Sequence, residues 1–120
     1  MRIQVSLILS LRNEILGNYR GRLDIIADIL HIASKNAKKT QIMYQANLSY
    51  RVLQRYLTEI SGAQLISFED GSHLYTLTDK GKEFLEAYET YSKTTKHIEK
   101  RLSDVATKKK VLEELCSDEE

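Results

Sequence analysis

Residues 47–57 read NLSYRVLQRYL, and this stretch decides the fold. Ser49 can cap the start of a helix, because its hydroxyl accepts a hydrogen bond from a free backbone N–H group. Apolar residues then recur at helical spacing, at Leu53, Tyr56, Leu57 and Ile60. If that stripe faces a core, the opposite, wet face holds Tyr50, Arg51, Gln54, Arg55 and Thr58. The pattern predicts an amphipathic helix over residues 49–61, closed by Gly62.

Two helices are expected upstream of this stretch. The first lies between Arg22 and Lys35 and stops near Asn36, and its inward stripe is Leu23, Ile26, Ile29, Leu30 and Ala33. A shorter second helix is predicted to begin near Thr40, a residue type that serves well as an N-cap, and to end at Asn47. Its inward residues are Ile42, Met43 and Ala46. Only a short turn is then left before the third helix.

The segment QLISFEDGSHLYTL, residues 64–77, predicts a β-hairpin. Two short runs of β-forming residues flank Asp70 and Gly71, a pair that tolerates the positive φ of tight hairpin turns. Thr78 is expected to cap a last helix, with Asp79 in its first turn where negative charge suits the helix dipole. The fold class is therefore mainly α with a small β-hairpin, in the order of a winged helix-turn-helix followed by a long C-terminal helix.

Two sequence runs resemble a known family. TQIMYQANLSYRVLQRYL (40–57) resembles the archaeal ten-kilodalton winged helix-turn-helix DNA-binding proteins, which are nucleoid-associated and transcription-regulator-like dimers. LYTLTDKGKEFL (74–85) resembles the end of their wing and the start of their last helix, and the resemblance spans about Tyr19 to Leu115. It implies double-stranded DNA binding as a homodimer, with the third helix in the major groove, the hairpin beside it and an antiparallel coiled coil at the C-terminus.

The residue types on the third helix favour the same function. Readout in the major groove needs long side chains with donors and acceptors near the N-terminal end of an inserted helix. Arg can reach guanine and Gln can reach adenine. The candidates for base contact are Tyr50, Arg51, Gln54 and Arg55, and those for phosphate contact are Lys38, Lys39, Thr40 and Ser49. The alternative is a polar face that is only solvated.

Further phosphate contacts are expected from the hairpin and the N-terminal region. Ser72 and His73 could reach the DNA backbone, although Glu69 and Asp70 would repel phosphate. A hairpin that only covers the core is the alternative. Arg12, Arg20 and Arg22 could also reach phosphates.

The last helix carries an unbroken heptad pattern. Residues at alternating steps of four and three are Phe84, Tyr88, Tyr91, Thr95, Ile98, Leu102, Val105, Lys109 and Leu112. Packing on the preceding domain could cover the first turns. A helix that spans Phe84 to Leu112 is roughly 43 Å long at about 1.5 Å per residue, which exceeds the width of a small domain. The stripe therefore predicts self-pairing into a homodimer.

The orientation of the dimer follows from one position of this pattern. A parallel pair would stack Lys109 against its twin and bury like charges. In an antiparallel pair Ile98 faces Leu102 of the other copy, and Lys109 can lie over Tyr91. That arrangement puts the two DNA-binding domains at opposite ends of the coil. We therefore expect sites about two turns apart, bent DNA, or bridging of two duplexes.

Length and charge set the domain organisation. The 120 residues suit one domain. We expect an N-terminal extension (1–18), a winged helix-turn-helix domain (19–80), a dimerisation helix (81–115) and an acidic tail (116–120). Residues 1–68 carry nine Lys/Arg against four Asp/Glu, and this basic half suits a polyanion partner, with solvated surface charge as the alternative. Residues 1–18 could be an edge strand, a helix or a flexible extension, or could result from an upstream start codon.

Other function classes lack support in the sequence. Cys116 has no internal partner, which favours a reduced cytoplasm, and no signal peptide or membrane span is recognisable. The family resemblance implies a nucleoid location within it. No phosphate loop or G-x-S-x-G motif is present, and His31 and His97 lack a second ligand at helical spacing. We therefore expect no enzyme activity, no cofactor and no metal. The rival function is a winged-helix protein-interaction module that does not bind DNA.

Overall fold

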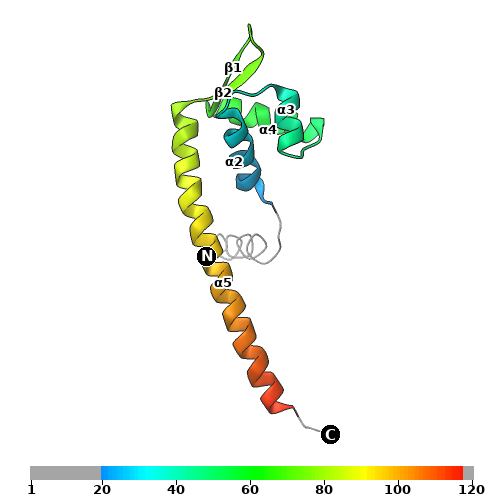
Figure 1. Cartoon of the computed structure of the whole chain (residues 1–120), viewed down its shortest axis with the longest axis vertical. Coiled ribbons are helices and arrows are strands. Elements are labelled where there is room, and N and C mark those ends of the chain that lie inside the picture. Colours follow the sequence, from blue (N-terminus) through cyan, green and yellow to red (C-terminus); the bar gives the residue numbers. More distant parts are fainter. Residues whose placement is uncertain (1–19, 118–120) are drawn as a thin grey trace, which may run out of the picture. The chain divides into compact units, whose positions relative to one another are not determined.

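The structure is a computed structural model that describes residues 20–117 (Figure 1). The elements are α2 (Arg22–Ala33), α3 (Lys39–Gln45), α4 (Tyr50–Gly62), β1 (Ile66–Glu69), β2 (Leu74–Leu77) and α5 (Asp79–Cys116). Residues 20–90 form one compact unit, and α5 from Tyr91 onward belongs to a second. The predicted order of helices and hairpin is confirmed. Residues 1–18, for which several structures were open, lie outside the described residues, as does the end of the acidic tail.

The core of the first unit is built from the predicted apolar stripes. The stripe of α2 is buried at Ile26, Ile29, Leu30 and Ala33, and that of α4 at Leu53, Tyr56, Leu57 and Ile60. Ile42 of α3 and Ala46, which directly follows that helix, join the same cluster. Full burial of a large aliphatic side chain contributes about 1.5–3 kcal/mol relative to exposure. This shared core therefore fixes how the three helices are rotated about their own axes.

The α2 and α3 helices end where asparagines were expected to stop them. Asn36 and Asn47 have φ values of 59° and 54°, a left-handed conformation that Asn tolerates better than most residues. The α3 helix begins near Thr40 as predicted, at Lys39, but the expected N-cap was wrong, because Lys38 is the N-cap and Thr40 lies inside the first turn. Ala37 makes a backbone bridge to the hairpin, which leaves Lys38 extended and lets the helix start earlier than the Thr40 signal suggests.

The α4 helix ends at Gly62, as predicted. The left-handed residue that follows the helix is Gln64, with a φ of 63°. Carbonyl groups at this helix end are bound by Thr78, just before α5, and by Lys80 in its first turn. Lys80 Nζ donates to the Ala63 carbonyl at 2.7 Å, and Thr78 Oγ1 donates to the Gln64 carbonyl at 2.7 Å. These side chains satisfy acceptors that a helix end leaves open.

The hairpin is confirmed, but its turn is not the tight Asp-Gly turn that was expected. β1 and β2 are antiparallel with Glu69 opposite Leu74, so residues 70–73 form the loop and the left-handed residue is His73, with a φ of 57°. This register pairs Ile66 with Leu77 beside the core and Phe68 with Tyr75, whose ring centroids are 4.8 Å apart. Pairing of apolar residues thus decides the register over the turn signal.

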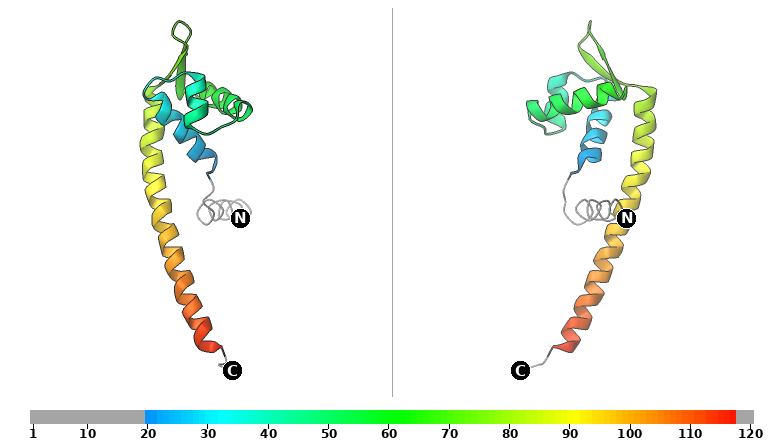
Figure 2. Two further views of the ribbon diagram at one scale, coloured as in Figure 1. Left: turned by 45° about the vertical axis from the view of Figure 1, so that its right-hand side comes forward. Right: turned by 180° about the vertical axis from the view of Figure 1, so that it is seen from behind.

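A third short strand segment ties the hairpin to the helices. Ala37 N–H donates to the Tyr75 carbonyl at 3.1 Å, and Tyr75 N–H donates to the Ala37 carbonyl at 2.8 Å. β2 is consequently bonded on both sides, by β1 and by the α2–α3 connection. The hairpin extends beyond the three helices of its unit (Figure 2). Its base, however, is held by backbone hydrogen bonds.

The α5 helix begins as predicted. Thr78 Oγ1 accepts a hydrogen bond from the Gly81 N–H at 3.0 Å, and Asp79 lies in the first turn. The helix has 38 residues, which corresponds to about 57 Å at the helical rise of roughly 1.5 Å per residue. Among residues 20–117, no helix is both apolar and long enough to cross a membrane.

Gly81 is required where α5 starts. A Cβ atom there would clash with the Leu65 carbonyl oxygen and lie 2.6 Å from Leu77 Cδ1, whereas a Cβ at Gly62 would meet no atom within 4 Å. Gly81→Ala is expected to lower the free energy of unfolding by about 1–3 kcal/mol through overpacking. Gly62→Ala is the matched control and should raise it by about 0.4–1 kcal/mol. Urea unfolding followed by circular dichroism tests this, and equal effects of the two substitutions would contradict it.

Candidate nucleic-acid interface

The α4 helix presents the polar face that its sequence predicts. Ser49 caps it, with Oγ accepting a hydrogen bond from the Val52 N–H at 3.3 Å. Leu53 and Leu57 are buried. The side chains on the other side are all exposed, and they are Tyr50, Arg51, Gln54, Arg55 and Thr58. Burial of one face therefore determines which donors reach solvent.

Arg20 holds the turn between α3 and α4 in place. Its Nη1 donates to Asp28 Oδ2 at 2.9 Å and to the Ala46 carbonyl at 2.7 Å, and its Nη2 donates to the Asn47 carbonyl at 3.4 Å. Arg22 forms an ion pair with Glu59 on α4. Both arginines were considered as phosphate contacts in the sequence. The structure instead places them within the unit, where Arg20 binds the carbonyls that end α3.

Three candidate residues that are distant in sequence come together at one point. Lys39 Nζ lies 3.1 Å from the Tyr50 hydroxyl, donates to Gln54 Oε1 and lies 4.3 Å from the centroid of the Tyr50 ring. The sequence assigned Lys39 to phosphate contact and the other two residues to base contact. Nothing in the local pattern predicts that they touch, because the contact depends on how α3 packs against α4.

The surface of α3 and α4 is electropositive. Glu59 is the next acidic residue after Asp28, and each of these two carboxylates is paired with an arginine. In residues 20–117, neither Arg51 nor Arg55 has an ion-pair partner, and Arg55 lies 5.8 Å from the Tyr56 ring centroid. The cations between the two acidic residues are Lys35, Lys38, Lys39, Arg51 and Arg55. An anionic ligand would therefore meet little competition from the protein's own carboxylates.

Sequence reasoning missed one large exposed side chain on α3. Tyr44 is 79% exposed, although Met43 beside it is half-buried. Helical spacing from Ile42 and Ala46 places Tyr44 on the outer face, so the signal was present. Its hydroxyl adds a further hydrogen-bonding group to the outer surface of the helix-turn-helix.

The hairpin loop offers fewer groups for phosphate contact than its sequence suggested. His73 is exposed, with its ring centroid 6.1 Å from that of Phe68. The Ser72 hydroxyl is shielded from solvent and has no hydrogen-bond partner within the described part of the chain. It would have to rotate outward to reach a phosphate. Glu69 and Asp70 are exposed beside it and add negative charge.

Comparison with known proteins identifies the family. A family model described as winged helix-turn-helix matches residues 19–96. The chain belongs to this winged helix-turn-helix family. An uncharacterized protein of Methanocaldococcus jannaschii, MJ0290, is 39% identical over 71 residues, which is 58% of this chain and 33% of that relative. The chain thus spans about a third of the length of the curated relative it matches.

Two solved structures share the winged helix-turn-helix architecture. Sso10a-2, described as a DNA-binding protein from Sulfolobus solfataricus, superposes with a TM-score of 0.57 and 29% identity, covering 82% of this chain and 100% of that one. NMB1585, a MarR family regulator from Neisseria meningitidis, gives a TM-score of 0.51 at 17% identity, covering 94% of this chain and 88% of that one. At that identity the second likeness supports the fold alone.

The first residues of the heptad pattern have partners inside the winged helix-turn-helix unit. Phe84 packs against the core, and its ring stacks on Tyr88 with the centroids 6.4 Å apart. The Tyr88 hydroxyl donates to Asp24 Oδ1, while Asp24 Oδ2 accepts from the Gly21 N–H at 2.9 Å. These contacts join α5 to the start of α2. The first turns of α5 therefore do pack on the preceding domain, which the sequence had left as a possibility.

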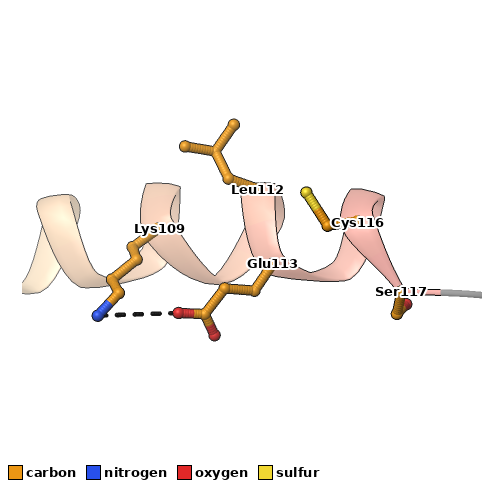
Figure 3. A pocket seen from close by; sticks show the side chains of 5 residues that line it. All are labelled: Lys109, Leu112, Glu113, Cys116 and Ser117. Carbon is orange, nitrogen blue, oxygen red and sulfur yellow. Dashed lines mark ion pairs between the residues drawn. The ribbon is translucent and has the colours of Figure 1, made fainter.

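Further along α5 the pattern is open to solvent. The exposed fractions are 41% for Ile98, 41% for Leu102, 62% for Val105 and 64% for Leu112. Near the end, Leu112 and Cys116 point to one side of the helix, while Lys109 and Glu113 lie on the other with Nζ and Oε1 3.8 Å apart (Figure 3). Within residues 20–117, no group of His, Cys, Asp and Glu is placed to hold a metal ion.

Arg20 and Arg22 provide a matched test of what holds the helix-turn-helix together. Arg20→Met should lower the free energy of unfolding by about 1.5–3 kcal/mol, because it removes charged hydrogen bonds to two turn carbonyls. Arg22→Met removes a surface ion pair and should cost less than about 1 kcal/mol. Thermal and urea unfolding measure both. A larger loss for Arg22→Met would show that the turn does not depend on Arg20.

Proposed function

We propose that this protein binds double-stranded DNA, with α4 in the major groove, and acts as a homodimeric transcriptional regulator or nucleoid-associated protein. The observation that carries the proposal is the electropositive outer face of α3 and α4, where Arg51 and Arg55 have no carboxylate partner in the described residues. Membership of the winged helix-turn-helix family supports it. So does the likeness to Sso10a-2, which is described as DNA-binding.

The residues divide into two roles in this proposal. Arg51 and Arg55 carry guanidinium groups on adjacent turns of α4, and such groups bind guanine edges in the major groove. Lys38, Thr40 and Ser49 lie at helix N-terminal ends, where free N–H groups and a positive dipole favour phosphate. Their contacts would position α4 without reading sequence. His73 on the exposed hairpin loop would add a backbone contact.

The exposed heptad residues of α5 support a homodimer. Ile98, Leu102, Val105 and Leu112 form an apolar stripe that water would otherwise cover, and a second copy presents the same stripe. We propose an antiparallel pair, because a parallel one would place the Lys109 side chains together. Glu113 beside Lys109 offsets part of that repulsion. An antiparallel pair favours DNA sites about two turns apart, bent DNA or bridged duplexes.

The rival proposal is a protein-interaction module that does not bind DNA. Tyr44 and Tyr50 favour it, since they are 79% and 62% exposed and tyrosine is enriched at protein interfaces. Binding to a mixed-sequence duplex at increasing salt separates the two. Each phosphate contact should lower log K by ~0.9 per log unit of salt. An interaction module would show no such binding even in dilute buffer.

Two alanine variants distinguish a regulator from an architectural protein. Arg51→Ala should reduce the preference for the best site by about 1–3 kcal/mol, because it removes a base contact. Lys38→Ala should weaken binding to specific and random DNA equally. It should also reduce the slope of log K against log salt concentration by ~1. Titrations on a selected and a random duplex measure both effects. Equal effects of the two variants would favour the architectural role.

The dimer has its own test. Leu102→Asp should give a monomer at micromolar concentration by light scattering, because it places a charge in the apolar stripe. Ser103→Asp adds the same charge off the stripe and should leave the dimer intact. In a Cys116→Ser background, a mixture of Ile98→Cys chains and Leu102→Cys chains should cross-link under oxidation if the pair is antiparallel, whereas each variant alone should not. Cross-linking by Leu102→Cys alone would show a parallel pair, because disulfides need Cα atoms within about 7 Å.

A further inference from the structure

We infer that Lys39 sets the base preference of α4 by occupying the amide oxygen of Gln54, so that Gln54 reads guanine rather than adenine. The inference rests on the proposed DNA binding. Its starting point is the hydrogen bond from Lys39 Nζ to Gln54 Oε1. An ammonium group can only donate, so the atom that faces it is the amide oxygen, and the Nε2 hydrogens are left for a ligand.

Adenine recognition by glutamine uses both halves of the amide. Nε2 donates to adenine N7, while Oε1 accepts from the N6 amino group. Oε1 keeps a second lone pair beside Lys39, but an amino group placed there would face the positive ammonium charge. Guanine presents N7 and O6, which are both acceptors. The Gln54 amide and the Lys39 ammonium can donate to these two atoms together.

Lys39 is held in this position by contacts within the helix-turn-helix. Its ammonium lies 3.1 Å from the Tyr50 hydroxyl and 4.3 Å from the ring centroid, and the side chain is half-buried between α3 and α4. The Tyr50 hydroxyl accepts from Lys39, so its own hydrogen remains for donation. Among described residues, Lys38 has no such contact and is exposed. Lys39 is thus a positioning residue rather than a free phosphate-binding lysine.

The rest of the face matches an acceptor-rich partner. Arg51 and Arg55 are donors only. Thr58 contributes one acceptor to this face. Its hydroxyl donates to the Gln54 backbone carbonyl at 2.9 Å, so the hydroxyl oxygen, one turn beyond Gln54 on α4, can still accept a hydrogen bond. A surface that consists mostly of donors suits the edge of guanine better than any other base edge in the major groove.

The test is selection of bound sequences from randomised duplexes by the full chain. The position of the DNA site that Gln54 reads is the one at which the protein loses its base preference in Gln54→Ala. At that pair the natural protein should prefer guanine over adenine by on the order of tenfold. Lys39→Met should abolish or reverse this preference, because it frees Oε1. Lys39→Arg, which still donates, should retain it.

Lys38→Met is the matched control, since it removes the same charge and should weaken binding to all sequences equally. Gln54→Glu gives a second test if Lys39→Met does not fold, because it keeps the contact to Lys39 but removes both amide donors and should lose the guanine preference. An adenine preference or no preference in the natural protein, or an unchanged guanine preference in Lys39→Met, would overturn this inference while leaving DNA binding intact. Failure of the natural protein to bind any duplex would overturn the proposed function itself.

Discussion

Burial of the apolar stripe of α4 is the constraint on which the polar surface depends. Leu53 and Ile60 are fully buried against a core shared with α2 and α3. Because successive helical residues are about 100° apart, this burial leaves no freedom in the direction of Arg51 and Arg55. A rotation of the helix that buried either guanidinium would remove a charge from water without a partner, which is strongly unfavourable. The core therefore orients the groups proposed to meet DNA.

The connections between elements convert this orientation into a rigid unit. Ala37 bonds to Tyr75, Lys80 bonds to the end of α4, and Arg20 bonds to the end of α3. Each contact satisfies backbone groups that would otherwise need water. The hairpin and the start of α5 are thereby fixed to the helix-turn-helix by the same hydrogen bonds. For the proposed function, the benefit is that little ordering remains to be done when DNA binds.

The α5 helix serves two purposes along its length. Its first turns complete the core, since Phe84 packs there and Tyr88 bonds to Asp24 at the start of α2. From Ile98 onward its apolar residues are exposed. A stripe of this kind is stable in water when another apolar surface covers it. The same heptad pattern therefore supplies intrachain packing at one end and, in the proposed dimer, contact with a second copy at the other.

The sequence by itself determined the elements, the core and the exposed face. Spacing of Leu53, Tyr56, Leu57 and Ile60 was enough to predict α4 and its direction, because helical periodicity is a local property. The Asn36 and Asn47 stops and the Ser49 and Thr78 caps followed for the same reason. The resemblance carried by residues 40–57 pointed to the family that the comparison then identified.

Only the tertiary structure decided the details that depend on contacts distant in sequence. The start of α3 follows from the Ala37 bridge, and the hairpin loop follows from the pairing of Phe68 with Tyr75. The tertiary fold also placed Arg20 on the turn carbonyls and Lys39 on Gln54. Local patterns state what a residue can bond to, but packing selects which partner comes within reach. That is why residue types could be assigned from the sequence and their hydrogen-bond partners could not.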